Sequence, residues 1–179
     1  MPFPAFKYHP NPIQTGSIQA RDTVCECCGK ARGYIYVGPV YAVEELEECI
    51  CPWCIASGLA AEKFDADFVD PDGVGQGWEP VGRNIVQEVS RRTPGFPGWQ
   101  QERWWTHCSD AGVFIGRAGA EEVMAHGDFT MTSMREDTGL DDPSKLQSYI
   151  DKLSKDGQPT AYLFRCRTCG MVGGYSDCT

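Results

Sequence analysis

The chain has 179 residues, a formal net charge of −9 and a hydrophobic fraction of 41%. This length and composition describe a folded protein of about one domain and exclude an intrinsically disordered chain. No run approaches the ~20 apolar residues of a membrane-spanning helix, and the acidic excess disfavours nucleic acid as a partner because the phosphates would be repelled. A protein partner, in particular a basic one, is favoured instead.

The first segment, residues 1–17, is rich in proline and aromatic residues, which predicts an extended strand-like path with aromatic side chains docked on the body. It lacks the basic and apolar regions of a secretory signal, so we expect a cytoplasmic protein. In that reducing compartment, the ten cysteines are better explained by metal–thiolate bonds than by disulfides. His9 is expected to face solvent, with a metal-ligand role as the alternative.

Two C-x₂-C motifs follow, one formed by Cys25 and Cys28 and the other by Cys51 and Cys54. Each such turn delivers two thiolates to one side of a tetrahedral Zn²⁺, and two turns joined by a strand close the coordination shell. The alternative is a redox or disulfide-bonded pair, because a proline follows Cys51 as in some dithiol oxidoreductases. The spacing therefore predicts a structural zinc ribbon.

Local patterns predict the elements between and beyond the motifs. Acidic residues dominate the segment 42–48, where they predict a solvated helix face, with a catalytic carboxylate among them as the alternative. Trp99, Trp104 and Trp105 are expected in the core. The expected elements are a strand over 33–38, helices over 42–48, 55–64 and 81–92, a loop over 65–80, helices over 119–125 and 143–153, and a strand over 161–164.

The end of the sequence repeats the pattern around Cys25 and Cys28, here called the first knuckle, at a constant offset of 141 positions. Two thiolates, from Cys166 and Cys169, do not complete a structural zinc site, and the missing ligands must come from upstream. The adjacent pair His107 and Cys108 is the best source. The repeated positions are Cys25, Cys28, Gly29, Gly33 and Tyr34 in the first knuckle and Cys166, Cys169, Gly170, Gly174 and Tyr175 in the second.

The fourth ligand of this second site is the open question. Neighbouring residues seldom both reach one ion, so His126, Cys178, Asp110 or a water molecule could replace His107. A water would leave the open position of a catalytic zinc. The simpler alternative is a free dithiol with a buried Cys108.

Two cysteines remain outside both sets. Cys27 and Cys49 lie one or two residues from proposed ligands, and packing explains them best, with a disulfide between them as the redox alternative. Together the patterns predict an α+β fold stapled by two zinc ions. Residues 1–179 form one domain: a zinc-ribbon portion over 22–64, a loop over 65–80, and a helical portion over 81–179 that ends in the second knuckle.

Several longer runs are similar to the CbrC-like family of bacterial proteins. The runs are Phe6–Lys7–Tyr8–His9–Pro10, Cys25–Glu26–Cys27–Cys28–Gly29, Gly33–Tyr34–Ile35–Tyr36, Gly38–Pro39–Val40–Tyr41, Cys51–Pro52–Trp53–Cys54–Ile55–Ala56, Ala61–Glu62–Lys63–Phe64, Arg92–Thr93–Pro94–Gly95–Phe96 and Trp105–Thr106–His107–Cys108. They cover nearly the whole chain, although Cys178 lies outside the pattern. The resemblance implies an association with tolerance to a nuclease colicin and supplies no catalytic residues.

Four functions are compatible with these features. The first hypothesis is a zinc-binding, non-enzymatic protein that acts by protein–protein interaction, such as a toxin immunity or colicin-tolerance factor. The second is a zinc-dependent hydrolase with an open zinc site near His107 and Cys108 and with Asp110 or Glu102 as general base. A thiol oxidoreductase and a nucleic-acid-binding protein are the remaining two.

Overall fold

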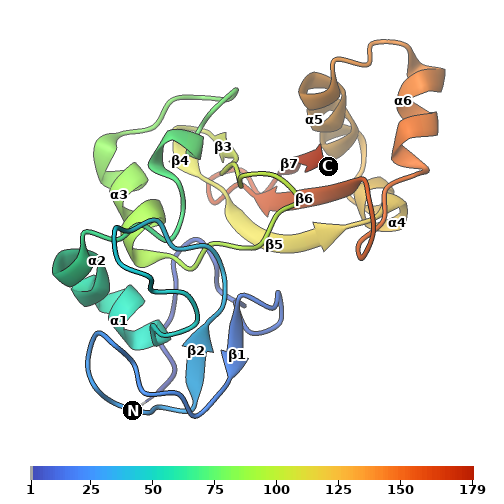
Figure 1. Ribbon diagram of the computed structural model, residues 1–179. Helices are drawn as coiled ribbons and strands as arrows, with labels where there is room; N and C mark the ends of the chain where they lie inside the picture. Colours follow the sequence, from blue (N-terminus) through green and yellow to red (C-terminus); the bar gives the residue numbers. More distant parts are fainter. Residues whose placement is uncertain (1) are drawn as a thin grey trace.

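The N-terminal part of the chain folds around the short strands β1 and β2 and the short helices α1 and α2 (Figure 1). The computed structural model describes residues 2–179. In chain order its elements are β1 (Ile18–Ala20), β2 (Tyr34–Tyr36), α1 (Pro52–Ser57), α2 (Leu59–Phe64), the 3₁₀ turn η1 (Pro71–Gly73), α3 (Arg83–Arg92), β3 (Thr106–His107), β4 (Asp110–Ala111), β5 (Val113–Ala118), α4 (Ala120–Ala125), α5 (Asp128–Thr138), α6 (Pro143–Ile150), β6 (Thr160–Arg165) and β7 (Val172–Asp177). The chain is thus a small mixed α/β fold.

The helix expected over 55–64 is present as two helices, α1 and α2. They meet at Gly58, whose φ of 81° places it in the left-handed region and interrupts the helix. Helix α1 begins earlier than expected because Pro52, at its first position, has a backbone already suited to a helix start. Strands β1 and β2 pair antiparallel beside them, with Ile18 opposite Tyr36.

The helix expected over 42–48 is wrong: the segment forms bends and turns. Tyr41 exchanges two backbone hydrogen bonds with Asp67, of 2.8 and 2.9 Å, which holds the chain extended where the helix would begin. At the other end, Glu48 has a φ of 54°, which an α-helix cannot include. Tertiary backbone pairing therefore overrides the local preference of this acidic segment.

The N-terminal arm docks on the body through its aromatic residues, as expected. Tyr8 is fully buried, and its carbonyl accepts a 2.8 Å hydrogen bond from the Phe114 amide. The solvent-facing position expected for His9 is wrong, because the ring is fully buried. Its Nδ1 lies 2.7 Å from the Pro94 carbonyl and its Nε2 lies 2.6 Å from the Thr15 hydroxyl, so both ring nitrogens are satisfied away from any cysteine.

The C-terminal half contains an antiparallel sheet in the order β5-β6-β7 as well as helices. Helix α6 begins at Pro143 with Asp142 as its N-cap, as predicted, and the Asp142 carboxylate accepts hydrogen bonds from the Ser144 and Lys145 amides at 2.9 and 3.0 Å. Helices α4, α5 and α6 lie on this half of the molecule (Figure 1). The segment 81–179, expected to be helical, therefore contains strands as well as helices.

Helix α5 covers the edge strand β7 with polar side chains. Thr130 donates a 2.7 Å hydrogen bond to the Val172 carbonyl, and the Ser133 hydroxyl both donates to the Gly174 carbonyl and accepts from its amide, at 2.9 and 3.0 Å. Asp137 accepts a 2.9 Å bond from the Ser176 amide. These contacts satisfy backbone groups that an edge strand otherwise leaves unpaired.

An aromatic core joins the two halves. Trp104 and Trp105 are buried as expected, and Phe96 stacks on Phe114 with 3.9 Å between ring centroids. Trp99 differs from the expectation because it is 38% exposed and donates from its indole to Thr160 at 2.9 Å. Across residues 2–179, the structure holds no helix with the length and apolar character to cross a bilayer.

Candidate metal centres

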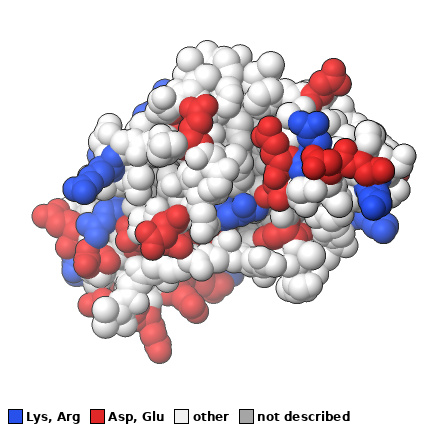
Figure 2. All heavy atoms as spheres, turned by 90° about the horizontal axis from the view of Figure 1, so that it is seen from above, with Lys and Arg blue, Asp and Glu red and all other residues white. Residues whose placement is uncertain are grey.

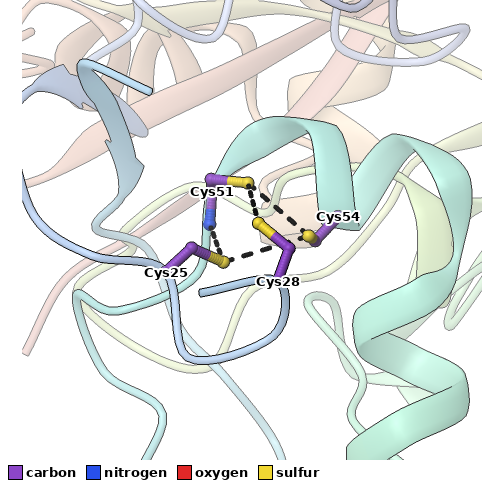
Figure 3. Close-up of side chains that lie close together, drawn as sticks. All are labelled: Cys25, Cys28, Cys51 and Cys54. Atoms are coloured by element: carbon purple, nitrogen blue, oxygen red, sulfur yellow. Dashed lines mark hydrogen bonds between the residues drawn. The ribbon is translucent and has the colours of Figure 1, made fainter. Parts of the chain in front are cut away.

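The first candidate centre brings four cysteine sulfurs together (Figure 3). The Sγ atoms of Cys25 and Cys54 lie 3.9 Å apart, those of Cys28 and Cys51 3.9 Å apart, and those of Cys51 and Cys54 3.6 Å apart. All four lie within 4.8 Å of one another. Zn–S bonds of ~2.3 Å place the sulfurs of a tetrahedron about 3.8 Å apart, so the spacing fits a four-thiolate metal site.

Local backbone geometry explains how each pair is presented. After Cys28 the chain turns at Gly29, whose φ is 67° and whose amide bonds the Cys25 carbonyl at 2.7 Å. The second pair comes from a helix start: Cys51 is the N-cap of α1 and Cys54 lies in its first turn. One tight turn and one helix N-terminus therefore face each other across the sulfurs.

The electrostatics of this cluster favour a bound cation. A side-chain hydrogen bond with Cys51 lowers the pKa of Cys25 to about 4, although burial opposes this shift. The same hydrogen bond raises the pKa of Cys51, and burial raises the pKa of Cys54. Several thiolates this close repel one another, and a divalent cation at their centre would remove that cost. The Cys51 amide, 3.2 Å from the Cys25 sulfur, stabilises negative charge there.

The second candidate centre assembles residues that lie far apart in the sequence. The Nδ1 atom of His107 is 3.3 Å from the Cys108 sulfur and 3.5 Å from the Cys169 sulfur, and Cys166 completes a group whose ligand atoms lie within 4.8 Å of one another. A Zn–N bond of ~2.0–2.1 Å with Zn–S bonds of ~2.3 Å predicts an S···N separation of about 3.5 Å. The structure thus brings together the four residues singled out from the sequence.

The turn between β3 and β4 explains how two neighbouring residues reach one point. Cys108 and Ser109 are its two central residues, with φ values of 53° and 59°. This is the left-handed pair of a two-residue hairpin, a conformation usually reserved for asparagine and glycine. Non-glycine residues held there cost about 1 kcal/mol or more each, and such strain gathers at functional sites.

The other half of this centre reproduces the first knuckle. Gly170 has a φ of 75°, and its amide bonds the Cys166 carbonyl at 3.0 Å, while the Cys166 amide bonds the Met171 carbonyl at 2.8 Å. In the first knuckle the Gly29 amide bonds Cys25 and the Cys25 amide bonds Lys30, at 2.7 and 3.1 Å. The constant sequence offset therefore corresponds to the same backbone turn.

Charges differ among the sulfurs of the second centre. Burial opposes ionisation of Cys166, but hydrogen bonds from the Cys169 backbone and the His107 side chain lower its pKa to about 6. The pKa of Cys108 is raised to about 11 by desolvation and by the Cys169 and Cys166 sulfurs. The Thr168 amide, 3.4 Å from the Cys166 sulfur, also stabilises the thiolate. A thiolate at Cys166 beside the protonated thiol of Cys108 is an arrangement from which a metal displaces a proton.

The alternative ligands and bases considered from the sequence lie elsewhere or have other partners. Asp110 accepts from the Tyr8 hydroxyl at 2.6 Å and from Arg167 at 2.7 Å. Glu102 is only 3% exposed and accepts from the Tyr41 hydroxyl at 2.7 Å. The group of ligand atoms contains neither His126 nor Cys178.

All ten cysteines are free thiols, including Cys27 and Cys49, so the disulfide considered between these two is absent. Burial raises the pKa of both thiols. Lys63 lies close by, donating from Nζ to the carbonyls of Glu26 and Cys27 at 3.0 and 3.2 Å. The ammonium therefore places a positive charge beside the first sulfur cluster.

The supports of the His107 ring were missed from the sequence. The ring stacks on Trp105 with centroids 5.3 Å apart and planes at 8°, and Phe129 of α5 meets it edge-on at 5.3 Å. Phe129, Thr132, Ser133 and Glu136 follow helical spacing and all line a cavity beside the ring. That spacing was the available signal, but the stripe is half polar and hides the usual apolar pattern.

The surface has acidic and basic side chains interspersed on the face shown in Figure 2, with no continuous basic stripe. This agrees with the formal net charge of −9.

Comparison with known proteins adds relatives of similar length. Residues 3–178 match the model described as "Uncharacterised protein family (UPF0167)". The chain is 47% identical to UPF0167 protein Mb2317 of Mycobacterium bovis over 180 aligned positions, covering 97% of this chain and 92% of the relative. It is 43% identical to UPF0167 protein PA1536 of Pseudomonas aeruginosa, covering 96% of this chain and 94% of the relative. No solved structure matches the chain significantly.

Proposed function

Since the chain belongs to the UPF0167 family, we propose that this member is a zinc-binding, non-enzymatic protein that acts by binding another protein. In this proposal both cysteine clusters hold Zn²⁺. The first forms a zinc ribbon over residues 22–64, and the second is a structural zinc site that links distant parts of residues 81–179. That none of the ten cysteines is in a disulfide supports a reducing, cytoplasmic location.

The observation that carries the proposal is the closure of both clusters by four protein side chains each. A structural zinc has four protein ligands, whereas a catalytic zinc keeps one position for water or substrate. A ligand set of thiolates with at most one imidazole also selects zinc over calcium or magnesium, which prefer oxygen ligands. The closed shells therefore favour a structural role over the hydrolase.

Charge supports a basic protein partner. With Zn²⁺ bound, four thiolates leave about −2 on the first cluster, and three thiolates with a neutral imidazole leave about −1 on the second. These charges add to an already acidic surface, which would speed the encounter with a basic protein. The resemblance to the CbrC-like family adds the expectation that this partner is a nuclease toxin.

The proposal is tested by calorimetric titration of the zinc-loaded protein with basic nuclease-toxin domains at low and high salt. A saturable complex that weakens as salt rises supports it, and heat changes indistinguishable from dilution with all such domains contradict it. X-ray absorption at the zinc edge tests the structural role separately: a water oxygen in the shell of either zinc would favour the hydrolase instead.

A further inference from the structure

A cavity of about 240 Å³ opens directly beside the second metal centre. Its lining includes Phe129 and Glu136 of α5 and also Trp78 and Glu79 of the loop before α3. His107 lines it too, so one of the candidate metal ligands borders the cavity. The site is therefore a separate space beside the four-ligand cluster, large enough for the end of a side chain.

Aromatic rings form much of its lining. Trp105 and His107 stack with planes at 8°, and Phe129 stands edge-on to both, at centroid distances of 6.5 and 5.3 Å. Trp78 lines the cavity from the loop. The faces of such rings attract cations within about 6 Å, and most strongly those of tryptophan.

The charged residues that line the cavity itself are acidic, and the Arg103 guanidinium lies next to one lining ring, that of Trp78. Glu79 and Glu136 are the cavity's only charged lining residues within the described part of the chain. Glu79 is held in place, because its carboxylate accepts a 2.9 Å hydrogen bond from the Ser109 amide and its carbonyl accepts a 2.5 Å bond from Thr106. Two carboxylates beside aromatic rings offer an organic cation both charge attraction and ring faces.

The structure also contains a cation bound between aromatic rings and a carboxylate. The guanidinium of Arg103 lies 5.0 Å from the Trp78 ring centroid and 4.4 Å from that of Tyr175, while its Nη2 bonds Asp137 at 2.6 Å. This internal example combines a tryptophan face, a second ring and a carboxylate. Guanidinium is planar and has N–H donors for both carboxylates, whereas a quaternary ammonium has none.

We propose that the cavity lined by Trp78, Glu79 and Glu136 binds a guanidinium group, presented by an arginine side chain or by a small guanidine compound. The inference rests on the proposed function, because an arginine of the basic partner would supply this group. Ser109 follows the ligand Cys108 and also holds Glu79, so the metal centre and the cavity share the β3–β4 turn.

The test is calorimetric titration of the zinc-loaded protein with two probes. Agmatine represents a free guanidine compound, and acetyl-Gly-Arg-Gly-amide represents an arginine side chain. We expect at least one of them to bind, and the tighter of the two identifies the source. The matched urea isosteres, N-carbamoylputrescine and the citrulline tripeptide, differ from the probes only in carrying a neutral urea in place of the guanidinium. They should bind at least tenfold more weakly, because the urea group loses the charge attraction of both carboxylates.

Variants locate the site. Glu79→Gln and Glu136→Gln should each weaken the guanidinium probe about fivefold, the upper range for an exposed ion pair. Glu121→Gln, an exposed position on α4 outside the cavity, removes the same charge and should leave affinity within twofold of wild type. Trp78→Phe keeps a ring but weakens the cation contact, and should lower affinity without changing zinc content.

Several outcomes would overturn the assignment. They are no binding of either probe at millimolar concentration, equal binding of the urea isosteres, binding of tetramethylammonium as tight as that of agmatine, or equal effects of Glu121→Gln and Glu136→Gln. If both probes fail while a basic protein still binds a chain that retains two zinc ions, only this inference is lost. If zinc is absent or no basic protein binds, the proposed function itself fails.

Discussion

Replacement of one sulfur in the second cluster gives the sharpest test of the metal assignment. Cys166 is buried, and its sulfur belongs to the group with His107, Cys108 and Cys169. Cys166→Ser should lower the zinc content from two ions per chain to one, because an alcohol is a far weaker zinc ligand than a thiolate. Cys178→Ser is the matched control, since Cys178 is exposed and lies in neither group.

The structure also gives the expected coordination. Sulfur separations of 3.6 to 3.9 Å correspond to metal–sulfur bonds of about 2.2 to 2.4 Å in a tetrahedron. Averaging one four-sulfur group with one group of three sulfurs and one nitrogen gives about 3.5 sulfur and 0.5 nitrogen neighbours per zinc in wild type. In Cys166→Ser the remaining zinc should show four sulfurs and no nitrogen.

The assays are elemental analysis of the purified protein and X-ray absorption at the zinc edge. The reasoning is refuted if Cys166→Ser retains two zinc ions, or if its remaining zinc keeps a nitrogen neighbour. It is refuted equally if Cys178→Ser loses an ion. Circular dichroism of each variant would show whether a loss of zinc reflects the missing ligand or a chain that failed to fold.

Three further predictions concern stability. Burial lowers the pKa of His9 from 6.5 to about 4. The unfolded chain therefore takes up the proton at a higher pH than the folded chain, and the free energy of unfolding should fall by about 3 kcal/mol as the pH drops from 6.5 to 4. Urea titrations at fixed zinc concentration should show a smaller fall in this free energy for His9→Gln. Gly29→Ala and Gly170→Ala place a methyl group in open space at positive φ, so each should cost about 1 kcal/mol in thermal unfolding; a clear difference between them would contradict a shared turn geometry. Ser133→Ala leaves the buried amide and carbonyl of Gly174 without their hydroxyl partner and should cost about 1–3 kcal/mol in the same assay, whereas an unchanged midpoint would contradict a role for α5 in covering β7.

The cysteine groups could be predicted from the sequence because a tight knuckle is a local structure. A C-x₂-C spacing followed by glycine fixes the turn within a few residues, and the repeat at Cys166 and Gly170 carries the same information. The residues that complete the site of Cys166 and Cys169 could be inferred only by elimination. What made His107 and Cys108 usable together was the left-handed turn at Cys108 and Ser109, which the residue types do not announce.

The helices that were missed or wrong share a physical reason. Helix α5 buries Thr130 and Ser133, which bond the backbone of β7, so its inner face lacks the apolar period that identifies a helix. The acidic segment 42–48 has helix-forming residues, but the pairing of Tyr41 with Asp67 decides its path. Long-range hydrogen bonds to backbone groups determine both cases, from side chains in α5 and from the backbone at Tyr41, and single-sequence patterns do not contain them.

The wide separation of the second cluster's ligands has a consequence for protein synthesis. The first cluster is complete once Cys54 has left the ribosome, whereas the second also needs Cys169, made 115 residues later. If the clusters bind zinc, the nascent chain would acquire its two ions at separate times. The ligands of the β3–β4 turn would stay without zinc until Cys166 and Cys169 had been made. Zinc shortage during translation would therefore harm the two halves of the molecule unequally.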